Sequence, residues 1–374
     1  MKKTFALLLC VILSFTLFAC TSGGGDDGGG TATGEVTEVM MITDLGGVDD
    51  GSFNQGTWEG IVRYCTEKGI SYDYLRPIEQ TTDGYMSSVE QAVSMGAKII
   101  LCPGFLFEPA IFKAQDLYPE TKFVLIDGYP NDQDWDNGPT YRTNDNVYAM
   151  CFAEQETGFL AGYACVMDGF RKLAFFGGMA VPAVVRFGYG WVEGAEFAAK
   201  ELGLEPGEVE ITYWYSGDFD PSPAKLTTVT GWYETGTEVI FSCGGTIVEN
   251  VISAAEGMTD KYIVGVDVDQ AALSKLIITS AMKNLGDVCY AQLTEFFNGN
   301  FKGGINAVLG TAEGMVGLPD DFSRFRNFTK DEYEAVYELL HNNVNNLAKG
   351  LHTETDAETP DQIPLEFVVV NYIA

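Results

Sequence analysis

The sequence is poor in basic residues: Lys and Arg together number 22, against 53 Asp and Glu, for a formal net charge of -31. A protein that binds nucleic acid needs a basic face for the phosphates, and docking on anionic lipid needs one too. The charge therefore excludes both kinds of partner. Only two His are present, which leaves little material for a His-based metal site or catalytic triad.

Common enzyme motifs are also missing. The chain has no Walker A, GxSxG or HExxH pattern, and these patterns mark phosphate, acyl-transfer and zinc sites. A GxGxxxG pattern at residues 188–194 lies inside a helical pattern instead of a strand-to-helix turn. Gly244-Gly245 follows a strand but lacks the third glycine of a dinucleotide site. We therefore expect no enzyme activity, no cofactor and no metal, while catalysis by carboxylates alone stays open because acidic residues are plentiful.

The eight cysteines form no CxxC pair, so the spacing of a metal site is absent. Beyond Cys10 and Cys20, the other six lie inside apolar runs, which favours buried free thiols. Disulfides stay open as the alternative, because an exported protein meets an oxidising medium. These six are Cys65, Cys102, Cys151, Cys165, Cys243 and Cys289.

The N-terminal segment indicates export. Lys2 and Lys3 precede an apolar stretch over residues 5–19, which is shorter than the ~20 residues of a membrane span and typical of a signal peptide. Its end, Ala19-Cys20, resembles the cleavage site of a bacterial lipoprotein; an ordinary secretory signal is the alternative. We predict a signal peptide over residues 1–19, lipid on Cys20 and a flexible Gly-rich tether over residues 20–34. The protein would then lie on the extracytoplasmic face of the cell membrane, held by lipid alone.

At 374 residues, the chain is long enough for about two domains. Short apolar runs alternate with helical patterns, which predicts βαβ units and parallel sheets. The expected strands are residues 39–43, 72–75, 99–102, 123–126, 173–176, 211–215, 239–242, 262–266, 276–279 and 365–373. The expected helices are residues 55–68, 87–95, 183–202, 247–256, 288–297 and 330–348.

Gly or Asp follows most of the expected strands, as at Asp44, Gly104, Asp127, Gly245 and Asp267. Ligands of open α/β sheets bind outside the carboxyl ends of the strands, so these positions predict a binding edge. About four strands precede residue 138, and four or five follow residue 171. We therefore expect two lobes with a small ligand in the cleft between them.

Residues 41–60, MITDLGGVDDGSFNQGTWEG, resemble the signature of the basic membrane protein family. These are PnrA-like substrate-binding lipoproteins of ABC importers, whose best-known members bind purine nucleosides. The resemblance covers most of residues 39–317 in the family order. Its further motifs are LIDG (125–128), ETGFLAGYAC (156–165), FFGGM (175–179), SGDFD (216–220), CGGTIVENVISAAE (243–256), VGVDVDQ (264–270) and ITSAMKN (278–284).

The resemblance implies an α/β, two-lobed periplasmic-binding-protein fold of the ribose-binding type, with a parallel sheet and flanking helices in each lobe. The chain should cross between lobes near residues 144–148, 280–284 and 310–318. The implied N-lobe is residues 36–146 plus 284–312, and the implied C-lobe is residues 147–283 plus 313–374. Such a protein passes its nucleoside to permease and ATPase subunits.

The family pattern also implies how the base is held. Phe53 and Phe219 would sandwich it from opposite lobes, and each stack contributes ~1–3 kcal/mol. Asp44 and Asn54 would face the polar edge of the base. From position alone, Phe53 could instead be a hydrophobic staple, and Asp44 could be a partner of the dipole of the following helix. Asp50 is expected to be a turn or cap residue.

The ribose would be read by Asp267 and Lys283, with Asp127 and the backbone near Gly245 completing the set by family analogy. A buried carboxylate and a buried ammonium need one another, since unpaired charges are costly out of water. Two rivals stay open beside the importer receptor. One is a receptor or sensor for a sugar or another small molecule, and the other is a carboxylate-based nucleoside hydrolase.

Overall fold

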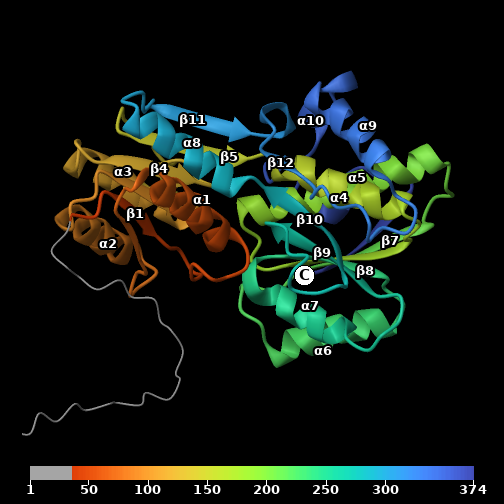
Figure 1. Cartoon of the computed structure of the whole chain (residues 1–374). Coiled ribbons are helices and arrows are strands. Elements are labelled where there is room, and N and C mark those ends of the chain that lie inside the picture. The colour runs from red at the N-terminus through yellow and green to blue at the C-terminus, as the bar shows by residue number, and fades with distance from the viewer. Residues whose placement is uncertain (1–35) are drawn as a thin grey trace, which may run out of the picture. The chain divides into compact units, whose positions relative to one another are not determined.

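Two sheets of mainly parallel strands organise the computed structural model, which describes residues 36–374 (Figure 1). The predicted α/β class with parallel sheets flanked by helices is confirmed. The predicted signal peptide (1–19), Cys20 and the tether (20–34) lie outside the described residues. The first sheet has the strand order β11 (Ile305–Leu309), β5 (Val147–Phe152), β4 (Lys122–Ile126), β3 (Ile99–Pro103), β1 (Val39–Ile42) and β2 (Tyr72–Leu75).

The second sheet is parallel except at one edge, where a two-residue strand runs antiparallel to its neighbour. Its strand order is β12 (Val316–Gly317), β10 (Ile277–Lys283), β9 (Tyr262–Asp267), β8 (Val239–Cys243), β6 (Lys172–Gly177), β7 (Val209–Tyr215) and β13 (Val368–Ile373).

Helices cover both faces of each sheet, because parallel strands bury both of their faces. On the first sheet, Val39 and Met41 of β1 face α1 (Phe53–Lys68) and α8 (Leu285–Phe297), while Met40 and Ile42 face α2 (Thr82–Ser94) and α3 (Glu108–Leu117). On the second sheet, α4 (Glu154–Met167) and α5 (Pro182–Leu202) cover one face, and α6 (Pro223–Glu234) and α7 (Val248–Ala255) cover the other.

The strand β5 corrects the expected boundary between the lobes. The expected boundary assigned residues 147–152 to the C-lobe. These residues pair with β4 and with β11, so they belong to the first sheet instead. The chain leaves the first sheet only after Phe152, where α4 begins at Glu154. It passes between the sheets again at Asn284, between β10 and α8, and through residues 310–315, between β11 and β12.

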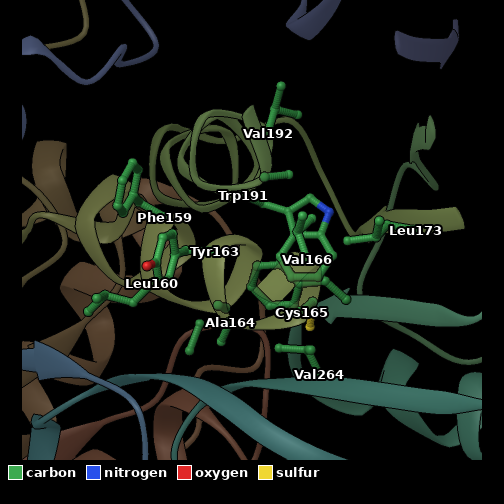
Figure 2. Packing of buried hydrophobic residues seen from close by; sticks show 14 of the residues in the cluster. Phe159, Leu160, Tyr163, Ala164, Cys165, Val166, Leu173, Trp191, Val192 and Val264 are labelled. Atoms are coloured by element: carbon green, nitrogen blue, oxygen red, sulfur yellow. The ribbon is translucent and has the colours of Figure 1, made fainter. Parts of the chain in front are cut away.

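The helices α4 and α5 approach so closely that glycine is required at their contact. A Cβ on Gly162 would lie 2.1 Å from the carbonyl oxygen of Trp191, and one on Gly194 would lie 2.0 Å from that of Phe159. Figure 2 shows side chains of both helices gathered with Val264 of β9 in one buried cluster. The GxGxxxG pattern at residues 188–194 therefore serves helix packing.

The C-terminal part returns to the second sheet. The expected helix over residues 330–348 ends early, because Asn343, Asn345 and Asn346 adopt left-handed backbone angles after α9 (Lys330–His341). A single turn, α10 (Leu347–Gly350), follows, and the chain then runs along α5 to β13, which pairs with β7. Among residues 36–374, no helix combines the length and the apolar character that crossing a membrane requires.

Candidate ligand-binding site

A cavity of about 570 Å³ lies at the carboxyl ends of the strands, lined by residues from both sheets. The loops after β1, β3 and β4 line it on one side, and the loops after β6 to β9, the N-terminus of α5 and the end of β10 line it on the other. The structure brings all eight binding residues expected from the sequence to this one cavity. They are Asp44, Phe53, Asn54, Asp127, Phe219, Gly245, Asp267 and Lys283.

Two aromatic rings enter the cavity, one from a helix that packs on the first sheet and one from a loop of the second sheet. Phe53 is the first residue of α1, and the ammonium of Lys283 lies 4.5 Å from the centre of its ring. Phe219 lies in the loop after β7, where its ring rests on two glycine backbones: a Cβ on Gly178 would be 2.3 Å from the ring, and one on Gly244 would be 2.6 Å from it. Both glycines are thus needed for the ring to occupy this place.

A buried lysine fixes the loop that carries Phe219. The Nζ atom of Lys225 donates to the carbonyl oxygens of Asp218 at 3.1 Å and Asp220 at 2.7 Å, and it also pairs with the Asp218 carboxylate. Thr246 Oγ1 donates to the carbonyl oxygen of Phe219 at 3.1 Å. These bonds hold the loop from both sides, so the ring position is set by the protein before any ligand arrives.

Asp44 is held in the cavity by its neighbours. Asn54 Nδ2 donates to Asp44 Oδ1 at 2.8 Å and to Asp50 Oδ2 at 2.9 Å, so both amide hydrogens already have partners. A direct contact between the Asn54 amide hydrogens and a base, as expected from the sequence, requires one of these bonds to open. Burial raises the pKa of Asp44 to about 6. The carboxylate Oδ2 of Asp44 lies against the backbone of Gly104.

The side chain of Asp50 caps the N-terminus of α1, as the sequence predicted, although Ser52 occupies the N-cap position itself. Its two carboxylate oxygens accept from the backbone N–H groups of Ser52, Asn54 and Gln55 at 2.9 to 3.0 Å. An acidic group at this place satisfies free N–H groups of the first turn and favours the dipole of the helix. Asp44 therefore does not serve as the cap and keeps an oxygen for the cavity.

Lys283 lies at the centre of a buried cluster of charges. Its Nζ atom is 2.6 Å from Asp127 Oδ2, 3.3 Å from Asp267 Oδ1 and 3.5 Å from Glu154 Oε1. Burial alone would lower the pKa of Lys283, but these three carboxylates raise it above its ordinary value. The expected pairing of Lys283 with acidic side chains is thus present, and the ammonium stays charged.

Asp127 and Asp267 close the ends of β4 and β9 with unusual backbone angles. Their φ values are 60° and 66°, a left-handed region that few non-glycine residues adopt and that Asp and Asn adopt more often than most. Ser52 Oγ donates to Asp267 Oδ2 at 2.5 Å. Asp127 Oδ1 is buried and has no hydrogen-bond partner within residues 36–374, and burial raises the pKa of Asp127 to about 7 although Lys283 opposes this.

Sequence reasoning missed two charged residues of this cluster. Glu154, the first residue of α4, is fully buried, and its Oε2 accepts from Arg186 Nε of α5 at 2.6 Å. Burial would raise the pKa of Glu154, but Arg186 and Lys283 outweigh it and hold the pKa below its ordinary value. One signal in the sequence could have indicated these two residues, since Glu154 and Arg186 each lie in a long, mainly apolar segment. Among residues 36–374, no group of three or more His, Cys, Asp or Glu side chains could hold a metal ion.

Comparisons with known proteins identify the family. A family model described as "ABC transporter substrate-binding protein PnrA-like" matches residues 37–346. The nucleoside-binding protein BmpA of an ABC transporter from Lactococcus lactis is 27% identical over 360 residues, which cover 90% of this chain and 95% of that protein. Basic membrane protein A2 of Borrelia garinii is 31% identical over 319 residues, which cover 83% and 87% of the two chains.

Solved structures show the same fold. A solute-binding protein of an ABC transporter system from Aeropyrum pernix superposes with a TM-score of 0.71 at 24% identity, covering 87% of this chain and 96% of that one. A solute-binding protein from Conexibacter woesei gives a TM-score of 0.63 at 17% identity. With the family match spanning most of its length, the chain belongs to the PnrA-like family of ABC transporter substrate-binding proteins.

Proposed function

We propose that the protein is the lipid-anchored, extracytoplasmic receptor of an ABC importer and binds a purine nucleoside in the cavity. The observation that carries this proposal is the pairing of two kinds of contact in one space. Phe53 and Phe219 reach the cavity from different sheets, and a Lys–carboxylate cluster lies beside them. A volume of about 570 Å³ lies within the usual range for sites of small molecules.

A nucleoside offers groups that suit both parts of the cavity. The flat base would stack between Phe53 and Phe219, and an N–H group on its edge would donate to Asp44. The ribose hydroxyls would donate to Asp267 and Asp127, while Lys283 would donate to a ribose oxygen. No charged group of the ligand is needed, which suits a neutral nucleoside better than a nucleotide in so acidic a protein.

The Lactococcus relative supports the ligand class, since that protein is called nucleoside-binding. The proposed lipid anchor rests on the sequence at Ala19-Cys20, and the proposed permease and ATPase partners rest on the family. The lobes would close on the ligand about the three segments that pass between the sheets. With no bond to break, the receptor needs no catalytic residue.

Calorimetric titration with adenosine, guanosine, inosine, uridine and ribose tests the ligand. We expect saturable binding of purine nucleosides and weaker binding of uridine and ribose. Binding of ribose with no response to any nucleoside would overturn the ligand proposal in favour of a sugar receptor.

Prolonged incubation with inosine, followed by an assay for free ribose, tests the hydrolase alternative; we expect the inosine to be recovered intact.

A second experiment tests the anchor and the partners. The full-length chain should appear in the membrane fraction and incorporate labelled fatty acid, and Cys20→Ser should abolish the labelling. Release of the wild-type protein into the medium without label would support an ordinary secretory signal.

Co-purification of a permease with the detergent-extracted receptor would support the importer role, while repeated failure under crosslinking would favour a sensor without a transporter.

A further inference from the structure

The C-terminal segment is attached along one stripe of α5. Arg186, Tyr189, Glu193 and Glu196 follow one another at helical spacing, and each contacts the chain beyond residue 351. Tyr189 donates to the carbonyl oxygen of Ala357 at 2.9 Å, and Glu193 accepts from the backbone N–H of His352 at 2.9 Å. The N-terminal turns of the same helix line the ligand cavity. One helix thus contacts both the C-terminal segment and the site.

A line of alternating charges runs from this segment to the cavity. Glu354 Oε1 accepts from Arg186 Nη1 at 2.9 Å, and Arg186 Nε donates to Glu154 Oε2 at 2.6 Å. The other oxygen of Glu154 lies 3.5 Å from the ammonium of Lys283, which contacts Asp127 and Asp267 in the cavity. The side chains of Glu154 and Lys283 are 0% and 2% exposed, so the inner interactions are shielded from solvent, while the side chain of Glu354 at the outer end is 30% exposed.

Arg186 is shared between two carboxylate partners. A guanidinium cannot give up its proton in a protein, so a buried one must be neutralised. With Glu354 in place, the fork of Arg186 is divided between two carboxylates, and its Nε points at Glu154. Without Glu354, the whole guanidinium is free to turn towards Glu154 and compete with Lys283 for it.

From this geometry we propose that Glu354 is a positioning residue for ligand binding, acting on Lys283 through Arg186 and Glu154. The residue lies beyond position 346, where the family match ends. The C-terminal segment of this chain therefore contributes to the electrostatics of a site that it does not touch. The effect on ligand affinity rests on the proposed nucleoside binding, whereas the effect on the charge cluster does not.

The first test compares variants by calorimetry with the best-bound purine nucleoside. We expect Glu354→Ala to weaken affinity by about three- to tenfold, the scale of coupling through packed neighbours. Glu358→Ala is the matched control, an exposed acid on the same segment whose side chain has no partner among the described residues. His352→Ala, which loses a contact to Glu193 but keeps the pair of Glu354 with Arg186, should bind as the wild type does.

The second test needs no ligand. Asp127 is faced by Lys283 of β10, Glu154 of α4, Arg186 of α5 and Cys151 of β5. Glu354→Gln removes a negative charge from this cluster but keeps an acceptor for Arg186, so it preserves the fold. The readout is the pH at which the decrease in melting temperature of the ligand-free protein is half complete, here called the pH midpoint. We expect this midpoint to move to lower pH in Glu354→Gln and to stay unchanged in Glu358→Gln.

The outcomes separate the two proposals. If the wild type binds a nucleoside but folded Glu354→Ala keeps the wild-type affinity and Glu354→Gln keeps the wild-type pH midpoint, the positioning role is wrong. If His352→Ala loses as much affinity as Glu354→Ala, the segment acts only by packing. If no nucleoside binds while Glu354→Gln still moves the midpoint, the proposed function fails and the coupling to the charge cluster stands.

Discussion

At the scale of single residues, compensation of charge shapes the candidate site. Lys283 pairs with Asp127 and Glu154, which lie 156 and 129 residues from it in the sequence, and Asn54 uses both amide hydrogens to hold Asp44 and Asp50. The rings of Phe53 and Phe219 make packing contacts but no side-chain hydrogen bonds, and both are only partly buried and line the cavity. Substitutions of the aromatic residues should therefore affect the ligand more than the fold.

We expect Phe53→Ala and Phe219→Ala each to weaken nucleoside binding by ~1–3 kcal/mol, the value of one stack on a base. Calorimetry measures the loss, and circular dichroism checks the fold. Trp58→Ala is the control, because Trp58 lies on the same helix as Phe53 but packs against Tyr72 and Tyr74. Wild-type affinity in folded Phe53→Ala would show that the base binds elsewhere.

Asp127 makes stability depend on pH in a defined direction. Its pKa rises from 3.8 to about 7 in the fold, so between these values the native state binds more protons than the unfolded chain. The free energy of unfolding therefore falls as pH rises through this window. Asp44, with a pKa of about 6, adds in the same direction over a narrower window.

Melting temperatures of the ligand-free protein should accordingly decrease between about pH 4 and about pH 7. Asp127→Asn should flatten this decrease, because the amide does not titrate. Asp136→Asn, which changes an exposed residue of the loop after β4, is the control and should keep the wild-type slope. A slope in Asp127→Asn equal to that of the wild type would contradict the assignment.

At the scale of elements, the contact between α4 and α5 depends on small residues. The carbonyl oxygen of Trp191 would lie 2.1 Å from a Cβ on Gly162, and backbone on a buried helix cannot move aside cheaply. We expect Gly162→Ala to destabilise the protein by more than about 3 kcal/mol, because overpacking forces backbone shifts. Chemical denaturation measures this change.

Gly231→Ala provides the contrast for that experiment. Gly231 lies within α6, and a Cβ there would meet nothing within 4 Å. Alanine favours a helix over glycine by about 1 kcal/mol, so this variant should be as stable as the wild type or more stable. If Gly162→Ala had the same free energy of unfolding as Gly231→Ala, α4 and α5 would be able to move apart without loss of stability.

The alternating runs were enough to predict most strands, because buried parallel strands are short and continuously apolar. They did not reveal α4, whose sequence EQETGFLAGYACVM has no polar stripe, since α5 and the second sheet bury nearly all of it. They also missed β5, whose first residues fell in an expected crossover, and β11, whose residues were assigned to no element. The binding edge was predictable because Gly and Asp mark strand ends.

The charge cluster shows where sequence reasoning stops. Arg186 lies 32 residues from Glu154 and 168 residues from Glu354, and no local pattern relates these positions. Family resemblance indicated Lys283, Asp127 and Asp267, but it did not extend to the carboxylate that the C-terminal segment contributes. Only the three-dimensional arrangement brings these residues together.

At the scale of the whole molecule, the net charge of -31 opposes compactness. Like charges repel across the surface, and salt screens this repulsion over a Debye length of about 10 Å at 0.1 M. We expect the melting temperature to rise as sodium chloride increases from about 0.01 M to about 0.3 M. A decrease would mean that the exposed ion pairs, such as Arg142 with Asp116, outweigh the repulsion.

The six buried thiols bear on how long the protein survives in an oxidising medium. Burial raises the pKa of Cys65 and Cys289 to about 12, so neither forms the reactive thiolate while the fold is intact. Unfolding would expose all six at once, and six cysteines can pair in about fifteen complete ways. Where oxidation of the exposed thiols outpaces refolding, an unfolding event becomes an irreversible loss, and the working lifetime is then set by the rate of unfolding and not by the equilibrium between folded and unfolded chains.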